Sequence, residues 1–432
     1  MSESRESRRD AGAGERLLRR RDVVRTGLTT AGALALGPEF WRAALAAPAE
    51  PGRSPYGPLG PPDRNGIRLP EGFRSRIIAR GGQPVRGTTY PWHAFSDGAA
   101  TYKTKDGGWI LVSNSEVPEA PGLPGLPGGT GEGGASAIRF AADGSIKRAY
   151  RILEGTSNNC SGGATPWGTW LSCEEIDEGR VWECDPRGHR RAKARPALGV
   201  FKHEAACVDR RTGRLYLTED LSDGGFYRFT PRRKGDLSAG RLEIARVKRD
   251  GFVEWKRVPE PLAKRRPTRQ QVPGATEFAR GEGIWFDSGL VYLATTEDSK
   301  IRAYNTRTER IRMVYNAKRL DDPPLTDVDQ ITVSRSGDLF VCEDDGGDDP
   351  FDIAIITPPP KRRVARFAKL TGPQHGDAGT EAASEVTGVV FNPSGRRLYF
   401  ASQRAFGTGV VYEVRGPFRR ERRHTRRKQG GR

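Results

Sequence analysis

Short apolar segments alternate with glycine-containing turns along most of the chain. In one clear copy of this pattern, the apolar segment 205–209 (AACVD) is followed by the turn 210–214 (RRTGR) and then by a second apolar segment, 215–218 (LYLT). Apolar runs of this length, joined by turns in which glycine accompanies Asp, Asn or Ser, are typical of β-hairpins. The pattern therefore predicts antiparallel strands rather than long helices.

The same hairpin pattern recurs six times, in four clear copies and two fainter ones. The copies begin near Trp92, Asn159, His203, Gly281, Asp327 and Ser384. A repeat that cannot bury its own apolar face must stack against its neighbours around a common axis. We expect an all-β fold, a six-bladed β-propeller, although five or seven blades would also fit the spacing. The propeller is predicted over residues 65–415, after a linker at 47–64 and before a basic, disordered tail at 416–432.

Acidic residues end the second strand of most copies and begin the first. In an antiparallel hairpin these two ends lie side by side, so the acids should form a ring at one mouth of the propeller. A single glutamate at a strand end would be read as a solvated turn residue. Several acids at equivalent positions of successive hairpins repel one another and are most easily kept together by cations. Hard oxygen donors suit calcium. The predicted metal ligands of this ring are Glu174, Glu204, Glu219, Asp220, Glu282, Glu297, Asp329, Glu343 and Glu385.

The five cysteines are an odd number, which leaves at least one thiol outside any disulfide. The run Trp167–Leu171 is expected to be an inner strand that meets the axis at Cys173. A thiolate among the carboxylates would select a transition metal such as iron, either at Cys173 or at Cys342. The alternative for each is a buried apolar residue. The chain lacks a CxxC pair, a GxSxG elbow and an HExxH motif, which argues against a zinc knuckle, a serine hydrolase and a zinc protease.

Charge and the N-terminal segment point to a location rather than to a reaction. The net charge is +18, but much of the excess lies in the two ends, and no nucleic-acid-binding motif accompanies it. Arg19–Arg21 precede a mildly apolar stretch that is too short for a stable membrane anchor. We interpret residues 1–46 as a twin-arginine signal peptide, which would export a folded protein to the cell envelope or beyond through the Tat translocon. The basic tail is either solvated or a weak anchor to anionic envelope material.

The segment 165–175 (TPWGTWLSCEE) resembles the PhoX family of exported alkaline phosphatases, as do His203–Ala205, Glu282–Trp285 and Val341–Asp344. The resemblance implies a six-bladed propeller with an iron–calcium cluster (Fe³⁺ and Ca²⁺) at its mouth, which hydrolyses phosphate monoesters. By the same resemblance, Cys173 is the thiolate ligand of iron. The implied carboxylate ligands are Glu174, Glu204, Glu219, Glu282 and Glu385, whereas Asp220, Glu297, Asp329 and Glu343 come from the ring argument.

One segment departs from the family pattern. Residues 403–407 read QRAFG, where the phosphatases of this family tend toward Gln-His-Pro-Gly. Arg404 could clamp phosphate as a catalytic residue, since a planar guanidinium suits phosphate oxygens, or it could mark a different substrate. The function expected is therefore a monomeric phosphatase acting on small phosphoesters. A lactonase-like calcium propeller and a non-enzymatic envelope-binding propeller stay open as alternatives.

Overall fold

A computed structural model describes residues 47–117, 133–344, 351–376 and 384–420. The predicted signal peptide (1–46) and most of the predicted tail (421–432) lie outside the described residues. Within the described residues the strands form six sheets. We call these sheets blades 1 to 6, in the order in which their inner strands follow along the chain.

Blades 1 to 3 are built from consecutive antiparallel strands. Blade 1 contains β5 (Ser96–Lys103), β6 (Trp109–Ser115), β7 (Gly133–Phe140) and β8 (Ile146–Thr156). Blade 2 contains β9 (Asn159–Ala164), β10 (Trp170–Glu174), β11 (Val181–Cys184) and β12 (Lys193–Ala194). Blade 3 contains β13 (His203–Val208), β14 (Leu215–Glu219), β15 (Phe226–Arg233), β16 (Asp236–Val247) and β17 (Val253–Arg257).

Blade 4 is also consecutive, whereas blades 5 and 6 include strands from the N-terminal part of the chain. Blade 4 contains β18 (Gly281–Asp287), β19 (Leu290–Thr295), β20 (Lys300–Asn305) and β21 (Arg310–Asn316). Blade 5 contains β22 (Val328–Val333), β23 (Leu339–Glu343), β24 (Asp352–Ile356) and β25 (Arg363–Leu370), extended by β3 (Ile67–Pro70), β2 (Leu59–Pro62) and β1 (Glu50–Pro51). Blade 6 contains β26 (Val386–Phe391), β27 (Arg397–Ser402), β28 (Val410–Arg415) and β4 (Arg74–Arg80).

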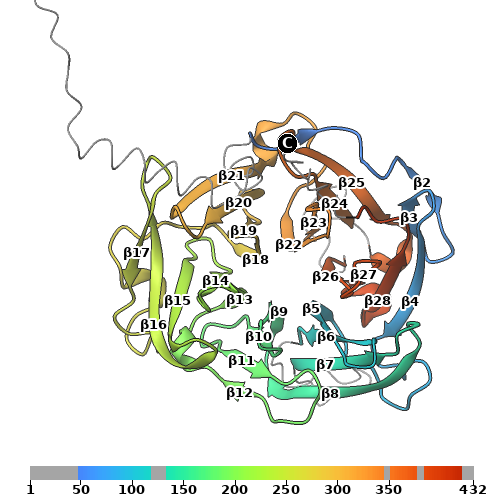
Figure 1. Ribbon diagram of the computed structural model, residues 1–432, viewed down its shortest axis with the longest axis horizontal. Coiled ribbons are helices and arrows are strands. Elements are labelled where there is room, and N and C mark those ends of the chain that lie inside the picture. The colour runs from blue at the N-terminus through green and yellow to red at the C-terminus, as the bar shows by residue number, and fades with distance from the viewer. Residues whose placement is uncertain (1–46, 118–132, 345–350, 377–383, 421–432) are drawn as a thin grey trace, which may run out of the picture. The chain divides into compact units, whose positions relative to one another are not determined.

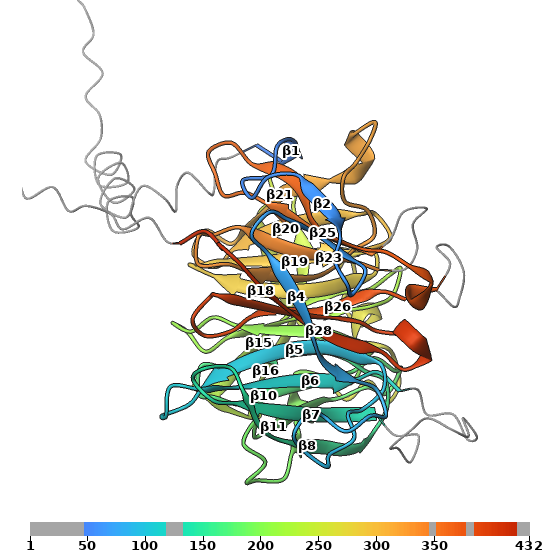
Figure 2. The same cartoon turned by 90° about the vertical axis from the view of Figure 1, so that its right-hand side faces the viewer.

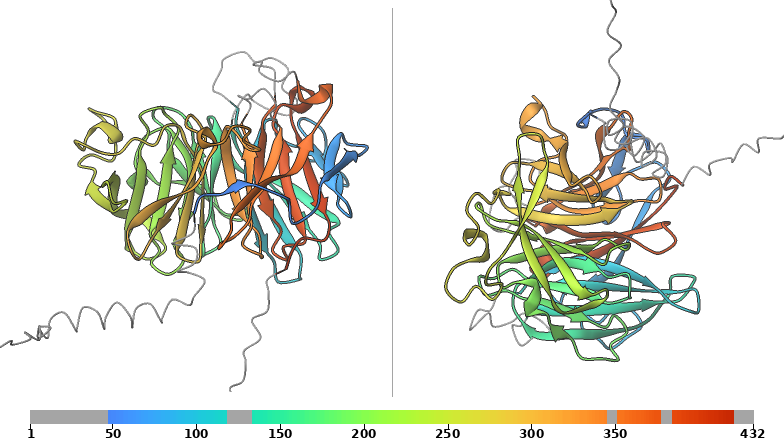
Figure 3. Two further views of the ribbon diagram at one scale, coloured as in Figure 1. Left: turned by 90° about the horizontal axis from the view of Figure 1, so that it is seen from above. Right: turned by 60° about the vertical axis from the view of Figure 1, so that its left-hand side comes forward.

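The inner strands β5, β9, β13, β18, β22 and β26 form a closed ring. Each contacts the next, and β26 contacts β5, so the blades surround a common axis (Figure 1). Seen from above, the strands of successive blades stand side by side (Figure 3). This arrangement confirms the predicted all-β propeller.

Short 3-10 turns make up the helical structure of the described residues. They are η1 (Pro196–Leu198), η2 (Thr268–Gln270), η3 (Ala317–Arg319), η4 (Pro373–His375) and η5 (Ala405–Gly407). Across the described part of the chain, none of the helices is long and apolar enough to span a membrane.

Two sequence expectations about segment positions need correction. The innermost strand of blade 2 is β9, and Trp167 lies in the turn before the second strand, β10. Small residues are required nearest the axis, where the backbones approach closely: a Cβ on Gly98 of β5 would lie 2.5 Å from the Cα of Ser161 in β9. The expected linker at 47–64 contains β1 and β2, which extend blade 5.

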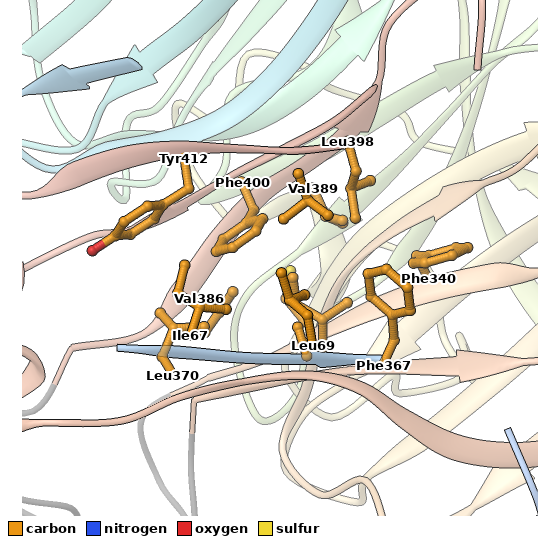
Figure 4. Close-up of a cluster of buried hydrophobic side chains, with 14 of the residues drawn as sticks. Ile67, Leu69, Phe340, Phe367, Leu370, Val386, Val389, Leu398, Phe400 and Tyr412 are labelled. Atoms are coloured by element: carbon orange, nitrogen blue, oxygen red, sulfur yellow. The ribbon is translucent and has the colours of Figure 1, made fainter. Parts of the chain in front are cut away.

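Apolar side chains fill the space between neighbouring blades. Between blades 5 and 6, Phe340, Phe367, Val389 and Phe400 belong to one buried cluster, which also includes Leu69 of β3 (Figure 4). The aromatic rings of Phe340 and Phe367 meet edge to face, with centroids 5.0 Å apart, an arrangement that aromatic pairs favour. Because each blade is covered on both faces, its central strands are almost continuously apolar.

An N-terminal strand closes the ring. β4 pairs with β28 in an antiparallel register, with Arg76 opposite Glu413 (Figure 2). The buried carboxylate of Glu413 accepts hydrogen bonds from Arg76 (2.7 Å), Arg397 (2.8 Å) and the hydroxyl of Tyr399 (2.7 Å). Burial alone would raise the pKa of Glu413, but the hydrogen bonds from Arg76 and Tyr399 outweigh it and lower the pKa.

We expect Glu413→Gln to reduce the free energy of unfolding by about 1.5–3 kcal/mol at pH 7, because Arg76, Arg397 and Tyr399 lose a charged hydrogen-bond acceptor. Since folding lowers the pKa of Glu413, its contribution is present above the unfolded pKa of about 4.3 and is lost as the pH falls through the folded value. Urea denaturation of both proteins at pH 7 and pH 3.5 measures the difference. Asp106→Asn, at an exposed pair with Arg139, is the control and should have little effect. A loss of stability with Glu413→Gln that does not change with pH would contradict the prediction.

Candidate metal centre

The six inner hairpins share one register at the end where the candidate site lies. The first residue of each inner strand, or of its paired part, stands opposite the last paired residue of the second strand. These pairs are Ser96–Ser115, Asn159–Glu174, His203–Glu219, Gly281–Thr295, Val328–Glu343 and Val386–Ser402. A bulge follows within each hairpin, and bulges of this kind redirect side chains at strand ends.

Three rings of residues follow from this register. The inner ring is the second residue of each inner strand: Asp97, Cys160, Glu204, Glu282, Asp329 and Thr387. The trailing ring is the residue after each second strand: Glu116, Glu175, Asp220, Thr296, Asp344 and Gln403. The leading ring is the residue before each inner strand: Phe95, Asn158, Lys202, Arg280, Asp327 and Glu385. In every blade the trailing residue donates its backbone N–H to the carbonyl of the leading residue.

Side chains of the inner and trailing rings converge into one acidic cluster that contains a thiol. The carboxylates of Asp97 and Glu116 lie within 4.8 Å of the Cys160 sulfur and of each other. Cys160 also lies in a second such group, with Glu175 and Glu204. Glu204 lies in a third, with Glu282 and Asp329. The three groups are Asp97–Glu116–Cys160, Cys160–Glu175–Glu204 and Glu204–Glu282–Asp329. Because they share members, they form a continuous line of candidate ligands across the mouth.

Glu204 lies at the centre of the cluster and is fully buried. Among the residues that the structure describes, neither of its carboxylate oxygens has a hydrogen-bond partner. Burial and the negative charges of Glu282 and Glu175 raise the pKa of Glu204 well above its usual range. A buried carboxylate in this setting requires a proton or a cation, so this position fits a metal ion.

Cys160 has a similar environment. Burial and the neighbouring charges of Asp97 and Glu204 raise the pKa of its thiol. A metal ion would reverse this effect, since coordination deprotonates a thiol outright. The combination of one sulfur and several carboxylate oxygens fits a mixed site that holds a softer and a harder cation.

Side-chain amides support one end of the cluster. Gln403 donates to Asp97 Oδ2 at 2.6 Å and also hydrogen-bonds Glu116. Gln330, from blade 5, donates to Asp97 Oδ1 and accepts from the backbone N–H of Gly388 at 2.6 Å. Burial raises the pKa of Asp97 to about 6 despite these hydrogen bonds. The amides therefore fix the orientation of Asp97 without neutralising it.

Three cations border the acidic rings. Lys202 lies 2.9 Å from Glu175, and Arg280 lies 2.9 Å from Asp220 and 3.1 Å from Glu282. On the other side of the mouth, Arg404 pairs with Glu385 at 3.1 Å.

The structure brings together some of the residues predicted from the sequence. Glu204, Glu282 and Asp329 share one group of the cluster, and Arg280 links Asp220 to Glu282. Glu385 faces this region too, because the charges of Asp344 and Glu116 add to burial in raising its pKa. Glu297, in contrast, follows the trailing residue Thr296 and is exposed.

Cys173 is the main correction. It packs with Leu171, Val181 and Leu198 in the hydrophobic core between blades 2 and 3, and the thiol at the cluster is Cys160. Side chains alternate between faces along a strand, so a shift of one position directs a residue to the opposite face. Cys160 follows Asn159 as Glu204 follows His203, and aligning those two strand starts would have identified it. Cys342 is also buried in an apolar cluster, between blades 5 and 6.

Three predicted ligands stand one position before the residues at the mouth and accept hydrogen bonds within the fold instead. They are Glu174, Glu219 and Glu343. Glu174 accepts the backbone N–H groups of Ser157 (3.3 Å) and Arg180 (3.2 Å). Glu219 accepts from the Tyr227 hydroxyl at 2.7 Å, and Glu343 from the N–H of Thr326 at 2.8 Å. The residues that reach the mouth are the next in sequence: Glu175, Asp220 and Asp344.

The sequence prediction also missed several residues of the mouth. Asp97, Glu116, Cys160, Glu175 and Asp344 were not among the predicted ligands, nor were the cations Lys202 and Arg280 among the predicted site residues. The second acid of the pairs EE (174–175) and ED (219–220, 343–344) was the available signal.

Among solved structures, several propellers resemble this chain at low sequence identity. A structural genomics protein of unknown function from Bacteroides thetaiotaomicron aligns with a TM-score of 0.49 and 9% identity over 82% of this chain and 84% of its own. A candidate gluconolactonase aligns with a TM-score of 0.39 and 15% identity over 83% and 97%. A chain of a nidogen–laminin complex aligns with a TM-score of 0.38 and 12% identity over 68% and 98%.

Comparison with sequences identifies a family. None of the curated proteins matches this chain. The model of the family described as alkaline phosphatase PhoX matches residues 130–181 and 177–316, which include Cys160, Glu175, Glu204 and Glu282. Over residues 130–316 the resemblance to the alkaline phosphatase PhoX family is therefore confirmed.

Proposed function

We propose that the protein is a metal-dependent phosphatase that hydrolyses small phosphate monoesters at the acidic mouth of the propeller. One observation carries this proposal: the line of candidate ligands from Asp97 to Asp329 runs through a segment that matches a phosphatase family. The family match itself indicates an alkaline-phosphatase-like hydrolase. The identity of the metals and of the substrate belongs to the proposal.

The donor set supports an iron–calcium cluster. Cys160, with Asp97, Glu116 and Glu175 around it, would hold iron, because a thiolate favours a transition metal. Glu204, Glu282 and Asp329 offer only oxygen and would hold calcium. When bound, such ions supply Lewis acidity toward phosphoryl oxygens and lower the pKa of water.

The chain's own residues contribute orientation and charge. Gln330 and Gln403, from the neighbouring blades 5 and 6, hold Asp97 in one orientation through its two carboxylate oxygens. Arg404 is about one-third exposed beside Glu385, where its guanidinium would bind phosphoryl oxygens of the substrate. Such fixed donors stabilise the charge that develops in phosphoryl transfer.

The cysteines provide a direct test of the metal assignment. We expect the purified wild-type protein to contain iron and calcium by elemental analysis and to release phosphate from p-nitrophenyl phosphate. Cys160→Ser should lose the iron and lower kcat/KM at least about 100-fold, since even residues outside the ligand shell alter metal affinity 10- to 100-fold. Cys173→Ser is the matched control and should keep both.

The opposite result, with iron lost in Cys173→Ser and kept in Cys160→Ser, would contradict the assignment. A wild-type protein that contains calcium alone and hydrolyses lactones but not phosphate monoesters would contradict the proposed activity.

Two glutamates of blade 3 separate the roles of metal binding and folding. Glu204→Gln removes a central candidate ligand and is expected to abolish calcium-dependent phosphate release. The thermal midpoint of the metal-free protein should be unchanged or raised, because the substitution removes buried like charge. Glu219→Gln should lower the thermal midpoint, since Glu219 pairs with Arg269 at 3.1 Å and with Tyr227, but should keep the metal content. Equal loss of metal in both variants would contradict the distinction.

We further propose that residues 1–46 direct export by the twin-arginine route, on the basis of Arg19–Arg21 and the apolar stretch after them. Fusion of this segment to a folded reporter should place the reporter outside the cytoplasm. Replacement of the three arginines by lysine should retain it inside, whereas lysine at Arg5, Arg8 and Arg9 should not. Export that is unaffected by the first replacement would contradict the proposal.

A further inference from the structure

Arg280 holds an unusual position among the charges of the mouth. It is the leading residue of blade 4, and its guanidinium pairs with Asp220 (2.9 Å), Glu282 (3.1 Å) and Asp344 (3.3 Å). These three carboxylates come from three different blades. The side chain is nevertheless 39% exposed, so solvent reaches it at the open end of the mouth.

The backbone at this position has a conformation that L-amino acids seldom adopt. Arg280 has a φ of 49°, and the leading residues Phe95, Asn158 and Asp327 also have positive φ. Such a left-handed conformation is costly for any residue except glycine and is concentrated at functional sites. The hydrogen bond from the N–H of Thr296 to the carbonyl of Arg280, at 3.0 Å, fixes it here.

Lys202 is the leading residue of the neighbouring blade and shares a partner with Arg280. Its ammonium lies 2.9 Å from Glu175 and 3.3 Å from Asp220. Asp220 thus lies between the two cations. Each cation is also paired with a candidate metal ligand: Lys202 with Glu175 and Arg280 with Glu282.

Metal ions and these two side chains compete for the same carboxylates, Glu175 and Glu282. When metal ions bind Glu175 and Glu282, the attraction that holds Lys202 and Arg280 to those carboxylates falls, and their positive charge becomes available to another anion. A guanidinium presents two parallel N–H donors that match two oxygens of a phosphate. Lys202 adds a compact charge on the adjacent blade.

We propose that Arg280 and Lys202 form a phosphate-binding pair that becomes available when metal cations bind the carboxylates of the mouth. The ligand class is the dianionic phosphoryl group of a monoester, so this inference rests on the proposed function. It adds a consequence that metal binding alone does not have: affinity for phosphate and affinity for the metal are coupled through Arg280. By linkage, each ligand strengthens the binding of the other.

The test is calorimetric titration with inorganic phosphate, below the solubility limit of calcium phosphate. The full-length protein is compared after loading with iron and calcium and after removal of both metals by chelation. Wild-type protein should bind phosphate only when loaded. Arg280→Gln and Lys202→Gln should each weaken this binding about 10- to 100-fold, the range for loss of a charged hydrogen bond. Elemental analysis of Arg280→Gln should give a metal content equal to or above wild type.

The control is Arg310→Gln. Arg310 lies in β21, the outer strand of the same blade, away from the mouth. Its exposure is similar, 40%, and it pairs at 2.9 Å with Asp250, which lies between β16 and β17 of blade 3. Its phosphate binding should equal that of wild type. Arg280→Lys keeps the charge but lacks the two parallel N–H donors of the guanidinium, so it should bind phosphate with intermediate affinity. This variant also tests the proposed binding pair if Arg280→Gln folds poorly.

Equal phosphate affinity in wild type, Arg280→Gln and Lys202→Gln would overturn the inference, as would tight binding of phosphate to the chelated protein. The proposed function fails in a different way. A loaded wild-type protein that binds phosphate through Arg280 but hydrolyses no monoester would refute the phosphatase activity and support the binding pair. Hydrolysis that is unchanged in both variants would do the reverse.

Discussion

The mouth of this propeller is organised by the repulsion among carboxylates that five of the six hairpins bring to one axis. These carboxylates stand at the start of an inner strand or directly after a second strand, so neighbouring blades place like charges within reach of each other. Water is excluded from the centre, where Glu204 is fully buried. Low polarity makes such charges strongly unfavourable unless cations balance them. The three bordering cations and the candidate metal ions both supply positive charge that balances these carboxylates.

Consecutive acids in this fold have two different tasks. In the pairs Glu174–Glu175, Glu219–Asp220 and Glu343–Asp344, the first carboxylate accepts hydrogen bonds, mainly from backbone N–H groups, and fixes its own blade. The second lies at the mouth and belongs to the shared charge. The alternation of side chains along a strand separates the two tasks by a single position. The rigidity of each blade and the chemistry at its end are therefore encoded side by side.

Much of the fold could be predicted from the sequence because hairpins are local. The apolar segments and glycine turns specify each pair of strands, and six copies indicate a ring. The site could be predicted only in part, because it depends on which face a residue takes, and a bulge in each hairpin alters that face. Glu204, Glu282 and Asp329 were found from their place at strand starts. Cys160 was missed because it stands among small residues (NCSGGA), whereas Cys173 directly precedes two glutamates in TPWGTWLSCEE. The pairing of Arg280 with three blades depends on distances between strands far apart in the chain, which no local pattern contains.

The pairing of β4 with β28 also sets an order of assembly. β4 leaves the ribosome first among the strands of blade 6, and its partner β28 leaves last. The ring of inner strands cannot close before the chain has been made almost to its end. The line from Asp97 to Asp329 draws its members from five blades, so the mouth comes together only in a nearly finished chain. Repulsion between carboxylates of different blades therefore acts mainly when the ring closes, whereas carboxylates of one blade, such as Asp97 and Glu116, meet as soon as that blade forms.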